Sequence, residues 1–521
     1  EGGSAQADRP HLLIIGWDGA TFDMLSPMVA AGRLPNVARL LERGRSAQLE
    51  STAIPISSAA WVAGMTGVGP GENGVYGFFE PVPDSYEVRL VDARCNEAPP
   101  LWRVLDARDK TVHVFGVPLT WPPEPLNGVM VSGMLSPPDA EYTWPPSLAG
   151  QLRGTGFLPD IGVWRNTQLP DRERVEQQLR LKEEALVSLL STRDWDAAVV
   201  VFKSLDVVSH QIYDGRLDGY VAEILERLDG ILGKLLEAAG PKTDVLLMSD
   251  HGFAAYPYGF DLHQWLVQEG FSVEAAEGPA GEAARRGPLV DLRPQQHRRR
   301  IDGLDLAATA AFASECEGHF GSLRLNLAGR EPEGSVSAEQ REAVLASIEE
   351  RLRAYAPEGK PLIHEVWRGE ELYPGGAHAV PDLIFEVRED HLVTAVEGAA
   401  LLSRFRAPRP DHDRQGILIA AGPRIAHAAD RGQWSIEDIT PTALHLMGLS
   451  VHEEMSGSVR TELCLDERPV QLVPRSADGD LSAPATGASS SMTNAQSEAM
   501  FQSLQSLGYA DGVENNGAED E

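Results

Sequence analysis

The nine residues HLLIIGWDG, numbered 11–19, contain the pattern that decides the fold. An almost unbroken apolar run without polar alternation is typical of a short strand that is buried on both faces, as in a parallel sheet. The run stops at Asp18-Gly19, where glycine allows the chain to turn sharply. The stretch therefore predicts an internal strand at His11–Trp17 with an aspartate at its carboxyl end.

The alternation of strand and helix continues further along the chain. A buried strand is predicted at Ala197–Phe202, and a strand returns at Val245–Met248. Between them, apolar residues from Val221 to Leu235 are spaced for one face of a helix. Strands that alternate with helices are typical of βαβ units. We therefore expect an α/β fold with a doubly wound, mainly parallel sheet flanked by helices.

A change of composition after Phe253 divides the chain into parts. We expect a catalytic core made of residues 11–253 and 381–465, which resumes with a strand at Pro381–Val387. Residues 254–380 are expected to form a smaller inserted α+β subdomain on the substrate side. Residues 466–521 read as a linker, a short docking helix and an acidic tail.

The overall charge of the chain excludes two classes of function. With 45 Lys and Arg against 77 Asp and Glu, the net charge of the 521 residues is −32. Neither a nucleic-acid scaffold nor an anionic membrane is a suitable partner, because both require clustered basic residues. No apolar run approaches the ~18–20 residues of a membrane span, so a soluble chain is expected. The sequence does not indicate an oligomeric state.

Cysteines and the amino terminus add little to this description. The 3 cysteines are widely separated, which fits neither a disulfide framework nor a cysteine metal site. The chain begins at Glu1 without an initiator Met. This favours an extracytoplasmic location, periplasmic or secreted, with a cytoplasmic location as the alternative.

Three aspartates lie at or just beyond the carboxyl ends of predicted strands: Asp18, Asp206 and Asp250. In open α/β sheets this edge is where ligands bind. One aspartate in such a place is more often a turn or helix-cap residue. Three of them at one edge favour a functional site.

Histidines accompany two of these aspartates and follow again later in the chain. The spacing Asp206-x-x-x-His210 places a carboxylate and an imidazole on one helical face. Asp250 is followed directly by His251, and His412 precedes another predicted strand. Each pair alone reads more simply as structural. Three carboxylates with three imidazoles together suit two Zn²⁺-like ions.

A pair of serines supplies the candidate nucleophile. Ser57 and Ser58 precede a stretch of small residues, where a serine is normally a helix cap. A serine hydroxyl becomes a useful nucleophile at neutral pH only when a base or a metal activates it. Both readings remain open on these residues alone.

The order of these motifs resembles the alkaline phosphatase superfamily, on the side of the type I phosphodiesterases and nucleotide pyrophosphatases. Further segments resemble its predicted phosphohydrolase/phosphomutase group, and the resemblance runs from about residue 11 to residue 509. The segments that carry it are Gly16-Trp-Asp18-Gly, Pro55-x-Ser-Ser-x-x-Trp61, Thr66-Gly-x-x-Pro-Gly71, Asp206-x-x-x-His210, Ser249-Asp-His-Gly252, Leu325–Gly334, Pro381-Asp-Leu, His412-x-x-x-Gly416, Asp438–Thr442 and Leu507-Gly-Tyr509.

The resemblance implies two divalent metal ions, Zn²⁺ first and Mn²⁺ as the alternative. It implies an alkaline phosphatase-like core and a serine that carries the phosphoryl group as phosphoserine. Counting back from Thr66-Gly67 places the nucleophile at Ser57, with Ser58 as the alternative register. The implied ligands of the first ion are Asp206, His210 and His412, and those of the second are Asp18, Asp250, His251 and the Ser57 oxygen.

The sequence departs from the nucleotide pyrophosphatases in the segment after the nucleophile. Asn73 stands in the place of their His, and Phe78 in the place of a phosphate-holding Asn, so specificity for nucleotides is not implied. Asn73 and Lys203 are candidate substrate-binding residues. The competing interpretation of Lys203 is an exposed lysine at a strand end. The basic run Arg298–Arg300 is either a steering element or a solvated loop.

The sequence thus predicts a metal-dependent phosphoester hydrolase, a phosphodiesterase or phosphatase, with a small-molecule substrate. Two alternatives remain: a phosphomutase with the same phosphoserine, and a metal-stabilised binding protein without turnover. A sulfatase is excluded, because the segment from Ser57 to Trp61 lacks the C/S-x-P-x-R pattern of its modified nucleophile.

Overall fold

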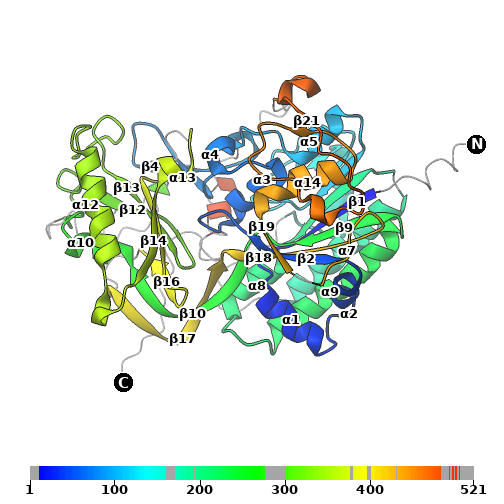
Figure 1. Ribbon diagram of the computed structural model, residues 1–521, viewed down its shortest axis with the longest axis horizontal. Coiled ribbons are helices and arrows are strands. Elements are labelled where there is room, and N and C mark those ends of the chain that lie inside the picture. The colour runs from blue at the N-terminus through cyan, green and yellow to red at the C-terminus, as the bar shows by residue number, and fades with distance from the viewer. Residues whose placement is uncertain are drawn as a thin grey trace, which may run out of the picture.

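A nine-stranded sheet forms the centre of the molecule (Figure 1). The computed structural model describes residues 11–159, 171–192, 194–275, 297–298, 301, 303–375, 380–395, 400–429, 431–482, 492, 496–497, 499–501 and 504. In spatial order the strands are β19 (Arg431–Ser435), β2 (Arg45–Glu50), β18 (Gln415–Ala421), β9 (Thr243–Met248), β1 (His11–Trp17), β8 (Ala197–Phe202), β5 (Val112–Phe115), β6 (Gly128–Val131) and β7 (Thr143–Trp144).

The sheet is mainly parallel, which confirms the fold class predicted from the sequence. β1 pairs in parallel with β8 on one side and with β9 on the other. Only β18 and β7 run against their neighbours among the described strands of this sheet. Alternate residues of β1 enter different cores, with Leu13 and Ile15 on one face and Leu12 and Ile14 on the other. A strand buried on both faces therefore requires the unbroken apolar run.

Helices cover both faces of the sheet, as expected for a doubly wound fold. On one face the helices are α1 (Phe22–Ala30), α2 (Pro35–Arg43), α7 (Arg172–Thr192) and α9 (Tyr220–Ala239). On the other are α5 (Leu101–Ala107) and α14 (Ile439–Leu446). Further helices of this part of the chain are α3 (Ser57–Thr66), α4 (Pro70–Asn73), α6 (Ser147–Thr155) and α8 (Ser204–Ile212).

A smaller α+β subdomain lies to the left in Figure 1 and has its own core. Its four strands, in spatial order, are β12 (Ala311–Glu317), β13 (Phe320–Leu325), β15 (Leu383–Val387) and β14 (Ile363–Arg368). Its helices are α10 (Leu262–Gln268), α12 (Arg341–Ala354) and α13 (Gly369–Leu372). Two long antiparallel strands, β10 (Gly252–Asp261) and β17 (Leu402–Asp413), connect it to the main sheet, with β16 (His391–Thr394) beside β10.

The expected return to the core at residue 381 is wrong. The strand predicted at Pro381–Val387 forms as β15, but it pairs with β13 and β14 of the subdomain. The apolar run of Pro381–Val387 is compatible with either sheet. The local sequence pattern does not indicate which strands it pairs with. The chain re-enters the nine-stranded sheet with β18, which is the strand predicted to follow His412.

The carboxyl-terminal segment is described only in part. The linker and the acidic tail lie largely outside the described residues, as does most of the expected docking helix. The described residues among 496–504 are helical, and Met500 and Leu504 are buried in the main core. The Phe501 ring packs edge-on against Phe79, with 5.9 Å between ring centroids.

Two smaller sheets contain the remaining described strands. β3 (Phe79–Pro81), β4 (Glu87–Leu90) and β11 (His297–Arg298) form one sheet, and β20 (Val451–His452) pairs with β21 (Leu472–Val473).

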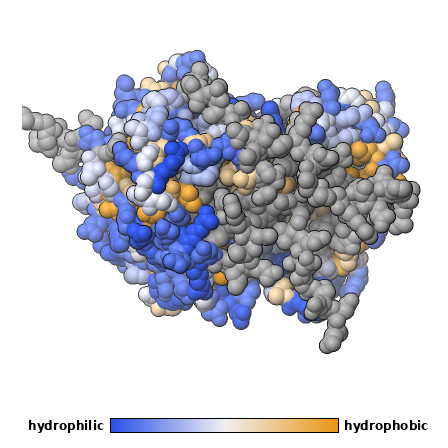
Figure 2. All heavy atoms as spheres, turned by 180° about the vertical axis from the view of Figure 1, so that it is seen from behind, coloured by the Kyte–Doolittle hydropathy of each residue, from blue (hydrophilic) through white to orange (hydrophobic). Residues whose placement is uncertain are grey.

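The described atoms on the face shown in Figure 2 are mostly those of hydrophilic residues. Among the helices that the structure describes, none has the length and apolar character to cross a membrane.

Candidate functional site

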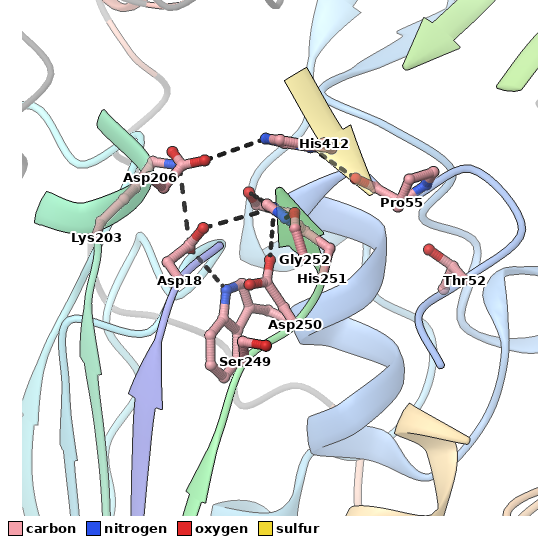
Figure 3. A network of polar contacts seen from close by, with 12 residues as sticks. Asp18, Thr52, Pro55, Lys203, Asp206, Ser249, Asp250, His251, Gly252 and His412 are labelled. Carbon is pink, nitrogen blue, oxygen red and sulfur yellow. Dashed lines mark hydrogen bonds and ion pairs between the residues drawn. The ribbon is translucent and has the colours of Figure 1, made fainter. Parts of the chain in front are cut away.

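Three neighbouring strands bring the three aspartates together at one edge of the sheet (Figure 3). Asp18 directly follows β1, and Asp250 lies two residues after β9. Asp206 lies in the first turns of α8, the helix that begins just after β8. All three side chains are fully buried. The carboxyl ends of β1, β8 and β9 thus point the aspartates at one another.

The first group of ligands joins Asp206 to two histidines. On α8 the i, i+4 spacing places His210 Nε2 3.3 Å from Asp206 Oδ1. His412 Nε2, from β17, lies 3.1 Å from the same oxygen and 2.9 Å from His210 Nε2. The other ring nitrogen of His412 donates to the carbonyl of Pro55 at 2.7 Å. This bond assigns the proton to Nδ1 and leaves the Nε2 lone pair facing the group.

The second group joins Asp18 and Asp250 to His251. His251 Nε2 lies 3.5 Å from Asp18 Oδ1 and 3.2 Å from Asp250 Oδ2. Its Nδ1 donates to the carbonyl of Gly252 at 2.9 Å, so its Nε2 lone pair also faces the site. The rings of His251 and His412 stack with centroids 3.6 Å apart, because β10 and β17 pair directly beside them.

These residues fit the metal ions that the sequence implies. Among the described residues, Asp18 Oδ1 and both carboxylate oxygens of Asp250 are buried without a hydrogen-bond partner. Buried, unpartnered carboxylate oxygens are costly unless a cation faces them. Potential ligand atoms also cluster within 4.8 Å in the sets Asp206, His251, His412 and Asp18, Asp250, His251. Mixed carboxylate and imidazole ligands suit Zn²⁺ or Mn²⁺.

The protonation equilibria follow from the burial of these groups. Burial raises the pKa of Asp18 to about 7 against the pull of Lys203, and burial with the nearby Asp18 charge raises the pKa of Asp250 well above its usual value. For Asp206, Lys203 and His210 outweigh burial and hold the pKa well below its usual value. Burial lowers the pKa of His251 and His412, which favours the neutral, metal-binding imidazole.

Lys203 lies inside this cluster. Its Nζ is 2.8 Å from Asp206 Oδ2 and 4.0 Å from Asp18 Oδ2, and only 7% of the residue is exposed. The interpretation of Lys203 as an exposed strand-end lysine is therefore wrong. The side chain turns inward because two buried carboxylates attract it, and these charges outweigh burial and raise its pKa. The sequence pattern at the end of β8 contains no signal for this direction.

The two serines begin α3, but they make different contacts. Ser57 Oγ lies 3.2 Å from His251 Nε2, within the second group. Ser58 is equally buried, and its Oγ has no hydrogen-bond partner among the described residues. The indole of Trp61, one turn along the helix, donates to Asp18 Oδ2 at 3.0 Å. Trp61 belongs to the quoted motif, but its contact with Asp18 was not predicted.

Asn73 makes its hydrogen bonds within its own loop. Its Nδ2 donates to the Val68 carbonyl at 3.0 Å, and its Oδ1 accepts from the Val75 amide at 2.9 Å. These bonds do not connect Asn73 to the aspartates and histidines of the site, and its role in substrate binding stays a prediction. Phe78 is a core residue, and the side chains of Arg298–Arg300 lie outside the described residues.

Comparisons with known proteins match most of the chain. The family model for type I phosphodiesterase/nucleotide pyrophosphatase matches residues 12–409. No curated protein sequence matches the chain. Among solved structures, phosphonoacetate hydrolase from Sinorhizobium meliloti 1021, in complex with phosphonoformate, has a TM-score of 0.56 at 15% identity, covering 84% of this chain and 95% of that one.

Further solved structures have a similar fold and a similarly low sequence identity. Murine ectonucleotide pyrophosphatase/phosphodiesterase 5 has a TM-score of 0.52 at 11% identity, covering 86% of this chain and 97% of that chain. The human protein of the same name has a TM-score of 0.52 at 12% identity, with coverage of 88% and 100%. At these identities the likeness shows a common fold.

Proposed function

The chain belongs to the type I phosphodiesterase/nucleotide pyrophosphatase family, and we propose that it hydrolyses a small-molecule phosphoester at a two-metal site with Ser57 as the nucleophile. One observation carries the proposal. The Ser57 hydroxyl lies 3.2 Å from His251, beside buried aspartates whose free oxygens have no hydrogen-bond partner among the described residues. A serine hydroxyl placed among buried atoms that suit metal coordination is the arrangement expected for this chemistry.

We assign the ligands of the two ions as the sequence implies: Asp206, His210 and His412 for one, and Asp18, Asp250, His251 and Ser57 for the other. When bound, Zn²⁺ or Mn²⁺ lowers the pKa of the serine hydroxyl and stabilises negative charge on the phosphoryl oxygens. Three carboxylates and a deprotonated serine together offset four positive charges. With the Lys203 ammonium added, the site carries a small net positive charge, so an anionic phosphoester can enter despite the acidic surface.

The side chains around Ser57 divide the remaining tasks. Deprotonated Ser57 attacks phosphorus as the bond from phosphorus to the ester oxygen breaks. The phosphoryl group becomes attached to Ser57, and the ester oxygen leaves with its organic group as an alcohol, which takes up a proton equivalent to the one that Ser57 lost. Water then attacks the phosphoserine, releases the phosphate product and restores the hydroxyl. Lys203, held at 2.8 Å from Asp206, is placed to contact a phosphoryl oxygen. Ser57 is the first residue of α3, so the positive end of the helix dipole favours the charge that develops there.

The test is a panel of p-nitrophenyl phosphate, bis(p-nitrophenyl) phosphate and a phosphonate, assayed after chelation and again with Zn²⁺ or Mn²⁺. We expect turnover of an ester that chelation abolishes and metal restores. Release of free phosphate from the monoester distinguishes hydrolysis from the phosphomutase alternative, which returns the phosphoryl group to substrate. Turnover that survives complete chelation, in protein without bound metal, would contradict the proposal.

A further inference from the structure

The turn between β12 and β13 in the small subdomain lies directly against the metal-ligand candidate His412. A Cβ atom added to Gly318 would come within 2.1 Å of the His412 carbonyl oxygen. Gly318 also has a backbone φ of +57°, a conformation that residues other than glycine rarely adopt. Both constraints demand glycine, and they bring the subdomain backbone into contact with the catalytic core at this point.

Next to this contact, the side chains of Tyr256 and Glu317 both lie against His412. The hydroxyl of Tyr256, on β10, donates to the His412 carbonyl at 2.5 Å. The same hydroxyl lies 3.2 Å from Nδ1 of His319, the residue after the glycine. Glu317 Oε1, on the other side of the turn, lies 3.3 Å from His412 Nδ1. Tyr256 is fully buried, and His319 and Glu317 are 4% and 6% exposed.

The cluster of Glu317, Asp411 and His412 has the spacing of a third metal site. The hydrogen bonds of His412 argue against that interpretation. Its Nδ1 donates to Pro55 at 2.7 Å and therefore carries the proton, so no lone pair remains on that nitrogen for an ion. A carboxyl group beside an imidazole N–H instead fixes the orientation of the ring.

We propose that the inserted subdomain completes the metal centre, with Tyr256 and Glu317 as positioning residues that hold His412 for the ion shared with Asp206 and His210. The inference rests on the proposed function. Tyr256 fixes the His412 backbone and Glu317 faces its ring, while Pro55 links the same ring to the loop before Ser57. Loss of such outer partners typically weakens metal binding by about 10- to 100-fold.

The experiment measures metal affinity of the full-length protein, stripped of metal, by competition for Zn²⁺ with a chromophoric chelator. In Tyr256→Phe and in Glu317→Gln we expect one of two ions to bind about 10-fold more weakly and the other to be unchanged. Excess Zn²⁺ should restore kcat in both variants with little change in KM. Matched controls are Tyr258→Phe, two residues along β10, and Glu315→Gln, two residues earlier on β12, which should bind both ions as the parent does.

The outcomes separate this inference from the proposed function. If both variants fold, as judged by circular dichroism and melting, and bind both ions as tightly as the parent, the inference is overturned while the proposed function stands. A third ion in the parent that is lost in Glu317→Gln would overturn it in favour of a third metal site. A parent protein that binds no metal would overturn both the inference and the proposed function.

Discussion

Two buried clusters of charge in this chain have opposite organisation. In the small subdomain, Asp382 accepts from the Arg330 guanidinium at 2.7 and 3.1 Å, and the Leu325 amide donates to Asp382 at 2.7 Å. At the edge of the main sheet, neither carboxylate oxygen of Asp250 has a hydrogen-bond partner among the described residues. Both aspartates are buried, at 6% and 0% exposure.

The difference separates a structural charge from a functional one. A buried carboxylate that is met by guanidinium and amide donors completes its bonding within the chain. A buried carboxylate that faces other carboxylates is stabilised by a proton or by a bound cation. The segments Leu325–Gly334 and Pro381-Asp-Leu, which carry part of the family resemblance, belong to the first kind. They build the subdomain, whereas Asp18, Asp206 and Asp250 build the site.

The largest loss of activity is expected from replacing the proposed nucleophile, which is present in the site cluster and absent from the Asp382 cluster. Ser57→Ala should lower kcat for the best ester by at least ~10³-fold, because the hydroxyl proposed to take up the phosphoryl group is lost. Metal content should stay nearly unchanged, since Ser57 supplies one oxygen among several ligands. The matched control is Ser58→Ala, equally buried but without the contact to His251. A loss confined to Ser58→Ala would shift the nucleophile by one residue.

The second prediction compares the two clusters directly through Asp250→Asn and Asp382→Asn. In metal-free protein at pH 8, Asp250→Asn should stabilise the fold, by on the order of 1 kcal/mol, because it removes a carboxyl group whose pKa is raised by burial and by the nearby Asp18. Asp382→Asn should destabilise it by about 2 kcal/mol, because Arg330 loses one of its two charged partners and keeps Glu331. Thermal or denaturant unfolding of both variants beside the parent measures the two changes.

Activity should follow the opposite order in these two variants. Asp250→Asn should lose a bound ion and lower turnover by roughly 100-fold, whereas Asp382→Asn should keep both ions and most turnover per folded molecule. Equal destabilisation of metal-free protein by the two substitutions would remove the distinction between the clusters.

A third prediction concerns the chain's own cation in the site. Lys203→Met should lower kcat/KM by about 10- to 100-fold, because a buried ammonium contact with a phosphoryl oxygen is lost. Lys182→Met is the matched control: its ammonium bonds the Val201 carbonyl and lies over the Phe202 ring at 5.0 Å. An equal decrease in both variants would show that Lys203 acts through the fold rather than on substrate.

The smallest expected effect is a dependence on pH. Burial raises the pKa of Asp18 from 3.8 to about 7, so at pH 5 the folded, metal-free chain keeps a proton that the unfolded chain has lost. The cost of Asp18 to stability therefore grows as the pH rises from about 4 to about 7 and then levels off. Asp18→Asn should raise the melting temperature of metal-free protein more at pH 8 than at pH 5. An equal gain at both values would contradict the raised pKa.

The parts of the molecule that follow from local pattern were predictable from sequence. The unbroken apolar run of β1 and the aspartates beyond β1 and β9 placed the sheet and its functional edge. The sheet to which β15 belongs was not predictable, because its partner strand β13 lies about 60 residues earlier in the sequence. The contacts of Lys203 with Asp18, and of Tyr256 with His412, likewise depend on the folded arrangement rather than on local spacing.

The most direct test of the central claim is the location of bound metal in crystals of the full-length protein, by anomalous scattering at the zinc edge. The account predicts two peaks in the chain. One should lie among Asp206, His210 and His412, and the other among Asp18, Asp250, His251 and the Ser57 oxygen. Crystals grown with Zn²⁺ that show no peak beside the unpartnered oxygens of Asp18 and Asp250 would contradict it.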